Sequence, residues 1–170
     1  MLNQQLAVLN EDYASSGVAF NLLGIDKTAN PAWSQDGAEN EMKSALRKGS
    51  YSTLNLYYLT YLSGYLGYCY FPTDAPEGSN DFTIDGCSIL ADTVPGGPAD
   101  GYNLGKTTTH EVGHWLGLYH TFQDGCDGGD EVSDTPAQDS PSSGCPVGRD
   151  SCPNAEGLDP IHNYMDYSTE

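Results

Sequence analysis

The sequence predicts one α+β domain, and three features of the chain carry that prediction. Its 170 residues are close to the length of a single domain, and 38% of them are apolar, which is enough to form a core. Segments with the apolar spacing of a helix alternate with segments that have the pattern of a strand. After residue 117 the chain is rich in Gly, Asp, Ser, Pro and Cys without periodicity, which predicts an irregular region held by disulfides or metal ions.

The first part of the chain is predicted to form two helices with a strand between them. Apolar residues at helical spacing span Leu2–Tyr13, and Gly17 is placed to end that helix. Val18–Leu22 then alternates like a half-buried strand. Ser34 is expected to cap a second helix, whose acidic residues come early and whose basic residues come late, as the helix dipole favours. The basic residues are expected on the helix surface: Lys43, Arg47 and Lys48.

The middle of the chain is predicted to supply most of the sheet. Residues 52–62 alternate and have a composition typical of strands, so they are predicted to form a central strand. Tyr68–Phe71 and Phe82–Ala91 are predicted as further short strands. A helical pattern returns over residues 105–117.

The formal net charge is −18, from 24 Asp and Glu against 6 Lys and Arg. This balance argues against binding to nucleic acids, which requires clustered basic residues at the phosphates. More than half of the excess lies in residues 121–170, where eight Asp and three Glu stand against one Arg. That region is compatible with cation binding.

No segment is predicted to span a membrane, and none has the pattern of a secretory signal peptide. The longest uncharged stretch, residues 50–73, contains seven Tyr and two Gly, which interrupt any apolar run of membrane length. The first five residues have neither the basic nor the apolar region of a signal. Neither the composition nor the motifs indicate an oligomeric state.

The chain has an odd number of cysteines, and no pair of them has the CxxC spacing of zinc ribbons or redox motifs. Two disulfides and one unpaired cysteine in an oxidising compartment fit this count best. The five are Cys69, Cys87, Cys126, Cys145 and Cys152.

Three of the four histidines fall within eleven residues, in the sequence HEVGHWLGLYH. His110 and His114 are four residues apart and would project from one face of a helix, where two imidazoles can bind one Zn²⁺. His120 could not reach the same ion from a continuing helix. Gly117 lies midway between His114 and His120, and it can break the helix and turn the chain. The spacing therefore predicts a zinc site with three imidazole ligands and a water.

Glu111 follows the first ligand and would project beside the metal without binding it. Zinc lowers the pKa of a bound water, and a neighbouring carboxylate can take the proton and deliver it to a leaving amine. This combination predicts metal-assisted hydrolysis, most naturally of a peptide bond. An isolated HxxxH pair is more often a surface or core pair. The five defined positions of HExxHxxGxxH, however, occur by chance in about one chain of this size in a hundred thousand.

A second cation site is predicted in the Gly-rich acidic segment 124–135, which carries hard oxygen ligands of the kind that Ca²⁺ prefers but lacks the EF-hand frame. The alternative is a solvated acidic loop without a cation. The candidate calcium ligands are Asp127, Asp130, Asp134 and Thr135.

The motif HExxHxxGxxH followed by a Met-containing turn is typical of the metzincins, and Met165 in HNYMDY lies 45 residues after His120. The sequence around these motifs resembles the pappalysin family, in particular its secreted fungal extracellular metalloproteases. The resemblance rests on four segments: GKTTTHEVGHWLGLYHTF, GDEVSDTPAQ, GCPVGRDSCP and GLDPIHNYMDYS. The resemblance implies a metzincin-like catalytic domain with a twisted mixed sheet, two or three helices above the cleft and an irregular, disulfide-stapled lower subdomain.

The resemblance also implies the roles of single residues. These are His110, His114 and His120 as zinc ligands, Glu111 as general base, and Met165 in the Met-turn. Tyr167 matches a tyrosine that donates a hydrogen bond to the tetrahedral intermediate, although a buried structural tyrosine is the alternative. Some pappalysins carry calcium near the acidic segment.

For the cysteines, the resemblance implies a Cys126–Cys152 disulfide and a partner for Cys145 beyond the Met-turn. Cys145 is therefore expected to be unpaired here, which leaves Cys69–Cys87 as the remaining pair. The C-terminal helix, a strand before Leu2 and a signal or pro-segment are absent from the 170 residues, so the chain is interpreted as a catalytic domain truncated at both ends. Its upper subdomain is expected over about 1–117 and its lower one over about 118–170. By analogy of position, Ile84–Ala91 is expected to be an edge strand that pairs with an extended substrate.

The sequence therefore predicts a secreted zinc-dependent endopeptidase that acts on proteins or peptides. Two alternatives remain at this point: an inactive extracellular module that binds zinc and calcium, and a zinc hydrolase of non-peptide amides. The intact Glu111 argues against the first of these.

Overall fold

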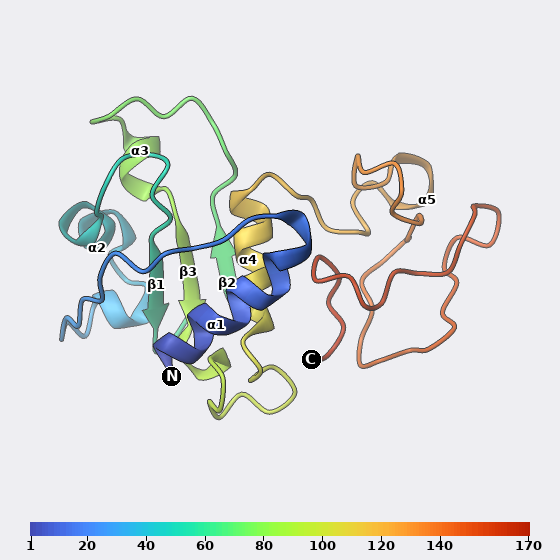
Figure 1. Cartoon of the computed structure of the whole chain (residues 1–170), viewed down its shortest axis with the longest axis horizontal. Coiled ribbons are helices and arrows are strands. Elements are labelled where there is room, and N and C mark those ends of the chain that lie inside the picture. The colour runs from blue at the N-terminus through green and yellow to red at the C-terminus, as the bar shows by residue number, and fades with distance from the viewer. The chain divides into compact units, whose positions relative to one another are not determined.

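The computed structural model describes all 170 residues (Figure 1). The chain divides into two compact units, Met1–Leu116 and Gly117–Glu170. The first unit contains the sheet and all helices except one short turn. The elements of the first unit are the helices α1 (Leu2–Tyr13), α2 (Glu39–Leu46), α3 (Asn80–Ile84) and α4 (Lys106–Trp115) and the strands β1 (Leu56–Leu59), β2 (Gly67–Cys69) and β3 (Cys87–Leu90). The second unit has α5 (Gly125–Gly128). The α+β class is confirmed.

The sheet has three strands in the order β1-β3-β2. β1 is parallel to β3, whereas β2 is antiparallel to it, so the sheet is mixed, as predicted. Cys69 of β2 lies directly opposite Cys87 of β3, and the two form a disulfide across the strand pair.

Two strand predictions in this region are wrong. β1 lies at an edge, and β3 is the central strand. The first residues of the predicted strand Phe82–Ala91 belong instead to helix α3, because the Ser79 hydroxyl accepts a hydrogen bond from the Phe82 amide and caps the helix. The expectation that Ile84–Ala91 is an edge strand is also wrong, since both sides of β3 are already paired and no peptide can add there.

Two predictions in the first part of the chain are also wrong. Val18–Leu22 forms no strand, because the Asn10 side chain, and not a neighbouring strand, forms hydrogen bonds with both the amide and the carbonyl of Phe20. Ser34 lies in a 3₁₀ turn, and helix α2 begins only at Glu39, after Ala38. By contrast, the helix Leu2–Tyr13 and the left-handed Gly17 that follows it, with φ 75°, are confirmed.

Lys43 was expected on the surface but is fully buried. Its ammonium group donates to the Ile84 carbonyl at 2.7 Å and pairs with Glu39 at 2.8 Å. The rings of Tyr57, Tyr68 and Tyr70 surround it at 4.7–5.5 Å. Because every donor direction meets an oxygen or an aromatic face, the charge can be accommodated inside the protein.

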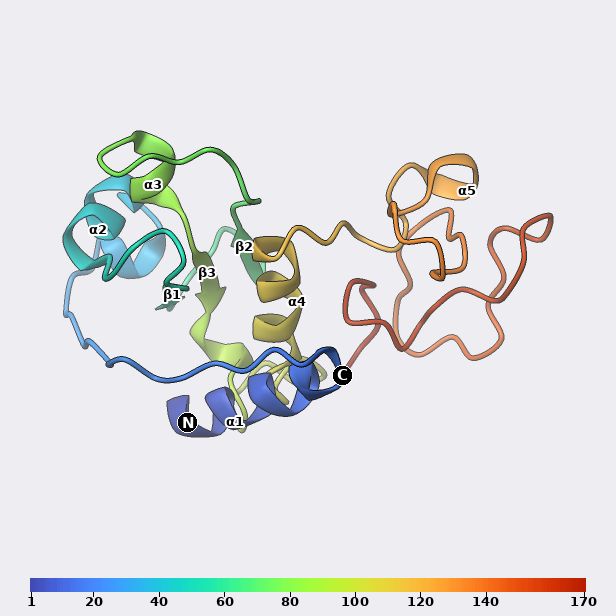
Figure 2. The same cartoon turned by 45° about the horizontal axis from the view of Figure 1, so that its top comes forward.

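Helix α4 packs against α1 and against the sheet, as Figures 1 and 2 show. Val112 is buried in a core with Leu9, Cys87 and Ile89. Polar contacts add to this apolar packing. Asp12 of α1 pairs with Lys106 at 2.7 Å, and the Tyr13 hydroxyl donates to the Thr109 carbonyl at 3.0 Å. Helix α4 is therefore held by both kinds of contact.

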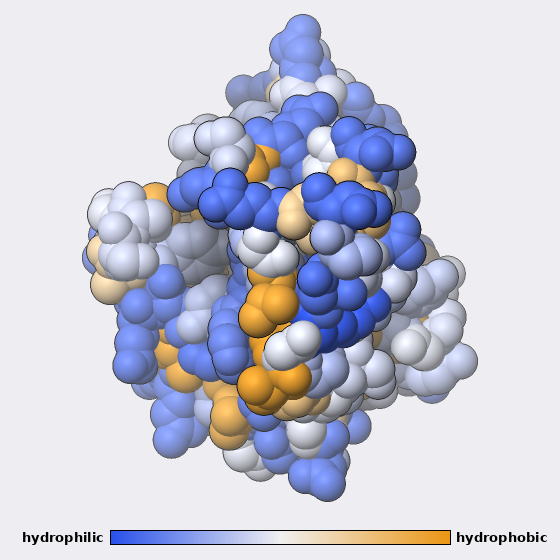
Figure 3. Space-filling model, turned by 90° about the vertical axis from the view of Figure 1, so that its right-hand side faces the viewer, coloured by the Kyte–Doolittle hydropathy of each residue, from blue (hydrophilic) through white to orange (hydrophobic).

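The second unit is almost entirely irregular. A disulfide joins Cys126 to Cys152, and Cys145 is an exposed free thiol. Arg149 and Asp159 form an ion pair at 2.7 Å. The face drawn in Figure 3 is largely hydrophilic, with hydrophobic residues in a narrow band and small patches. Across the whole chain, no helix is long and apolar enough to cross a membrane.

Candidate metal centre

Helix α4 places His110 and His114 on one face, one turn apart. Their Nε2 atoms are 3.1 Å apart, and their rings meet edge to face with centroids 4.8 Å apart. The helix ends at Trp115, and Gly117 has a φ of 95°. The prediction that Gly117 breaks the helix is therefore confirmed, because this backbone conformation strongly favours glycine.

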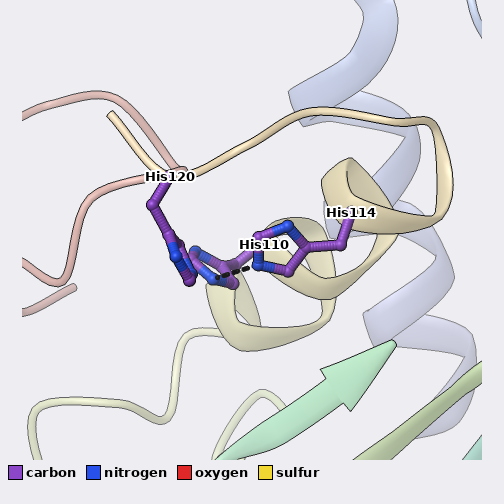
Figure 4. Close-up of side chains that lie close together, drawn as sticks. All are labelled: His110, His114 and His120. Atoms are coloured by element: carbon purple, nitrogen blue, oxygen red, sulfur yellow. Dashed lines mark hydrogen bonds between the residues drawn. The ribbon is translucent and has the colours of Figure 1, made fainter. Parts of the chain in front are cut away.

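The side chains of three histidines lie close together, as Figure 4 shows. Ligand atoms of His110, His114 and His120 all lie within 4.8 Å of one another, and His114 is buried. In the whole chain this is the single group of three or more His, Cys, Asp or Glu side chains that is placed to hold a metal ion. Three neutral imidazoles are a donor set that suits zinc and related transition metals.

The Glu111 carboxylate lies in a buried position beside β2. The residue is only 5% exposed, and its Oε2 has no hydrogen-bond partner. Burial raises the pKa of this carboxyl group to about 8. A buried polar oxygen without a partner is costly unless a donor or a cation comes to it.

Gly67 makes room for Glu111, which the sequence patterns did not predict. A Cβ atom at position 67 would lie 2.6 Å from Cγ of Glu111 and 2.7 Å from its Oε1. Both distances are far below van der Waals contact, so any side chain at this position would displace the carboxylate. The alternating pattern of β2 gives no sign of this requirement, because the two residues are 44 positions apart.

Other residues around α4 also escaped the sequence patterns. The ring of Phe71 lies against His114, with centroids 5.2 Å apart. Asp85 is buried and accepts hydrogen bonds from the Trp115 indole and from Arg47, both at 2.9 Å. These contacts hold the end of the helix that carries His110 and His114. Leu116, the first residue after α4, is 40% exposed.

In the second unit His120 belongs to a cluster of three rings. It stacks on Phe122 with centroids 4.8 Å apart and meets Tyr167 edge to face at 4.9 Å. Met165 is buried, and its carbonyl accepts a hydrogen bond from the Thr121 amide at 3.3 Å. A backbone hydrogen bond therefore joins the two segments that carry His120 and Tyr167.

The carboxylates of the acidic segment 124–135 do not form a group that could hold a metal ion, unlike the three histidines. Asp127 and Asp134 are exposed. Asp130 is buried, and its Oδ1 accepts a hydrogen bond from the Val132 amide at 3.0 Å, an ordinary local turn contact. Calcium binding at Asp127, Asp130, Asp134 and Thr135 stays a prediction.

This site has the features of a metallopeptidase of the metzincin type. They are two histidines one turn apart on a helix, a glycine that ends the helix, a third histidine after it, and a buried glutamate. Comparison with known families gives the same class. The family model Peptidase_M43, described as pregnancy-associated plasma protein-A, matches residues 78–170. The chain belongs to this family.

The chain is similar to two fungal relatives, each 64% identical to it and matched along its whole length. They are an "Extracellular metalloprotease" of Colletotrichum graminicola and an "Extracellular metalloprotease 1" of Coccidioides posadasii. The chain spans only 61% and 62% of the length of these curated relatives.

Among solved structures, mirolysin in complex with compound 9 superposes with a TM-score of 0.77 at 28% identity, over 99% of this chain and 76% of mirolysin. Tannerella forsythia mature mirolysin in complex with a cleaved peptide has a TM-score of 0.69 at 27% identity, over 98% of this chain and 76% of that one.

Proposed function

We propose that this chain is the catalytic part of a secreted, zinc-dependent endopeptidase. The observation that carries the proposal is the three-histidine group together with the buried, unpartnered carboxylate of Glu111. The two compact units are proposed to be the upper and lower subdomains of one catalytic domain, as the pappalysin resemblance implies. The names of the fungal relatives and the two disulfides support secretion.

The residues present fit a zinc ion. His110, His114 and His120 would hold it, because three imidazoles leave one position of a tetrahedral site open, as catalytic zinc requires. When bound, zinc supplies a Lewis acid and lowers the pKa of a bound water. The orphaned Oε2 of Glu111 supports the same assignment, since a buried carboxylate beside the site needs a donor to bind.

Glu111 is proposed to be the general base. It would accept a proton from the attacking water and then donate that proton to the leaving amine of the cleaved peptide bond. Its Oε2 has no hydrogen-bond partner within the protein, so it can accept a hydrogen bond from the attacking water.

Tyr167 is proposed to stabilise negative charge on the oxygen of the scissile carbonyl. Its ring lies against His120, and the residue is 47% exposed. A phenol O–H is a suitable donor to an oxyanion. Met165 is proposed to support His120 from the neighbouring segment, through the bond between its carbonyl and the Thr121 amide.

The proposal is tested with denatured casein as the substrate, with and without a zinc chelator. Wild-type protein should bind one zinc and cleave casein, and the chelator should stop cleavage. Glu111→Gln should retain zinc and lose about 10²–10⁴-fold in kcat. The matched control is Glu41→Gln on the exposed face of α2, which should change neither property.

Two outcomes would contradict parts of the proposal. Near-normal turnover by zinc-loaded Glu111→Gln would exclude this residue as the base. Stoichiometric zinc without cleavage of casein or of a peptide library would instead favour a non-catalytic binding module.

A further inference from the structure

Gln138 is fully buried in the second unit, and both ends of its side-chain amide are engaged. Its Oε1 accepts a hydrogen bond from the Thr121 hydroxyl at 2.7 Å. Its Nε2 donates to the Ser140 carbonyl at 3.0 Å, to the Ser142 hydroxyl at 3.1 Å and to the Asp166 carboxylate at 3.0 Å. No helix or strand contains Gln138, so regular backbone structure does not explain its burial.

The two most distant partners of Gln138 adjoin the candidate site on two separate segments. Thr121 directly follows His120, and Asp166 directly precedes Tyr167. A single amide therefore bridges segments that lie about 45 residues apart in the chain. The backbone bond from the Thr121 amide to the Met165 carbonyl, at 3.3 Å, joins the same two segments.

The chemistry of the partners determines how the amide is oriented. Burial tends to raise the pKa of Asp166, but hydrogen bonds from Ser142, from the Tyr167 backbone and from Gln138 outweigh it and lower the pKa. Asp166 is therefore an anion that only accepts hydrogen bonds, and it must face the Nε2 of Gln138. The Oε1 is then left for the Thr121 hydroxyl, so the amide has one satisfactory orientation.

We propose that Gln138 is a positioning residue that holds the His120 segment and the Met165–Tyr167 segment in one register. It acts through Thr121 and Asp166 and does not itself touch the substrate. The inference rests on the proposed function, because it concerns how the third ligand and the tyrosine are presented together. The ring contact between His120 and Tyr167, at 4.9 Å, is the geometry that Gln138 maintains.

The test uses Co²⁺ in place of zinc, because the visible absorption of Co²⁺ reports the arrangement of its ligands. Gln138→Met keeps the length of the side chain and removes all of its hydrogen bonds. We expect a changed cobalt spectrum, metal affinity lower by about tenfold, and kcat lower by about 10–100-fold with KM within about twofold. A residue that contributes only to stability would move none of these three quantities.

The matched control is Ser151→Ala. Ser151 lies in the same unit and bonds to Asp159 and to the Asp139 amide, both at 2.9 Å, but to neither segment of the site. This variant should lower the melting temperature and leave the cobalt spectrum and kcat unchanged. If folded Gln138→Met behaves in the same way, the proposal is overturned.

A second pair of variants decides the question if Gln138→Met does not fold. Thr121→Val removes one hydroxyl at almost constant volume, and it should change the cobalt spectrum and kcat in the same direction by about tenfold. Thr121→Ser keeps the hydroxyl and should restore both. A normal spectrum in Thr121→Val would overturn the proposal. If the spectrum responds to these changes but wild-type protein cleaves no peptide, the proposed function fails while the positioning role stands.

Discussion

The two units of this chain place the histidines of the candidate metal site by different physical means. In the first, the backbone of α4 sets the spacing of His110 and His114, and Val112 anchors the helix in an apolar core. In the second, His120 lies on irregular backbone that is held by a disulfide and by buried hydrogen bonds around Gln138. Regular structure needs only local hydrogen bonds and apolar burial, whereas irregular structure needs each polar contact to be made individually.

The largest expected difference between the units concerns the Cys126–Cys152 disulfide. Replacing both cysteines by serine should destabilise the second unit by about 2–5 kcal/mol, because the unfolded segment is no longer constrained. Hydrogen exchange should show lost protection after residue 117 and retained protection in α4. Zinc affinity should also fall in this variant, since the segment that carries His120 is no longer held by a disulfide. Equal loss of protection in both units would show that they unfold as one.

The next effect in size should come from Gly67→Ala in the first unit. The added Cβ would lie 2.6 Å from Cγ of Glu111, so the carboxylate must move. A displacement of about 1 Å can reduce kcat/KM by about 10²-fold, while the three histidines should still bind zinc. Gly24→Ala is the control, because a Cβ at that position meets no atom within 4 Å. Unchanged turnover in Gly67→Ala would show that the position of the carboxylate is not critical.

A smaller and pH-dependent effect should follow from Asp166→Asn in the second unit. Hydrogen bonds to the carboxylate lower its pKa in the folded state despite its burial. A lowered pKa contributes stability that is present above the ordinary carboxyl pKa and is lost as the pH falls through the lowered value. The variant should therefore be less stable than wild type by about 1–3 kcal/mol at pH 7. The free energies of unfolding of the variant and of wild type should converge in strong acid.

Urea unfolding across pH measures the effect of Asp166→Asn, with the exposed Asp150 changed to Asn as the control. A stability difference that stays constant down to strong acid would contradict the assignment.

Calcium should have the smallest effect. If the acidic segment binds Ca²⁺, a concentration ten times the dissociation constant should stabilise the zinc-loaded protein by about 1.4 kcal/mol. The gain should disappear in Asp134→Asn and should not be reproduced by Mg²⁺. A melting temperature that is indifferent to Ca²⁺ at fixed zinc would remove the calcium site.

In the first unit the sequence predicted some features correctly and others wrongly. The helices 2–13 and 106–115 and the glycine breaks after them were predicted correctly, because helical periodicity and left-handed glycines are local properties. The prediction of a strand over Val18–Leu22 was wrong because the Asn10 side chain makes the hydrogen bonds to the Phe20 backbone that a neighbouring strand would have made. The prediction that Lys43 lies on the surface was wrong for a similar reason, since the oxygen and aromatic partners that bury it come from distant segments.

The sequence by itself determined the α+β class, the helical spacing of His110 and His114, and the break at Gly117, because each depends on residues within a few positions of one another. Only the tertiary structure decided that β3 is central, that Gly67 makes room for Glu111, and that Gln138 joins the segments of His120 and Tyr167. These features depend on contacts between residues far apart in the chain. Neither periodicity nor motif spacing records which distant segments meet when the chain folds.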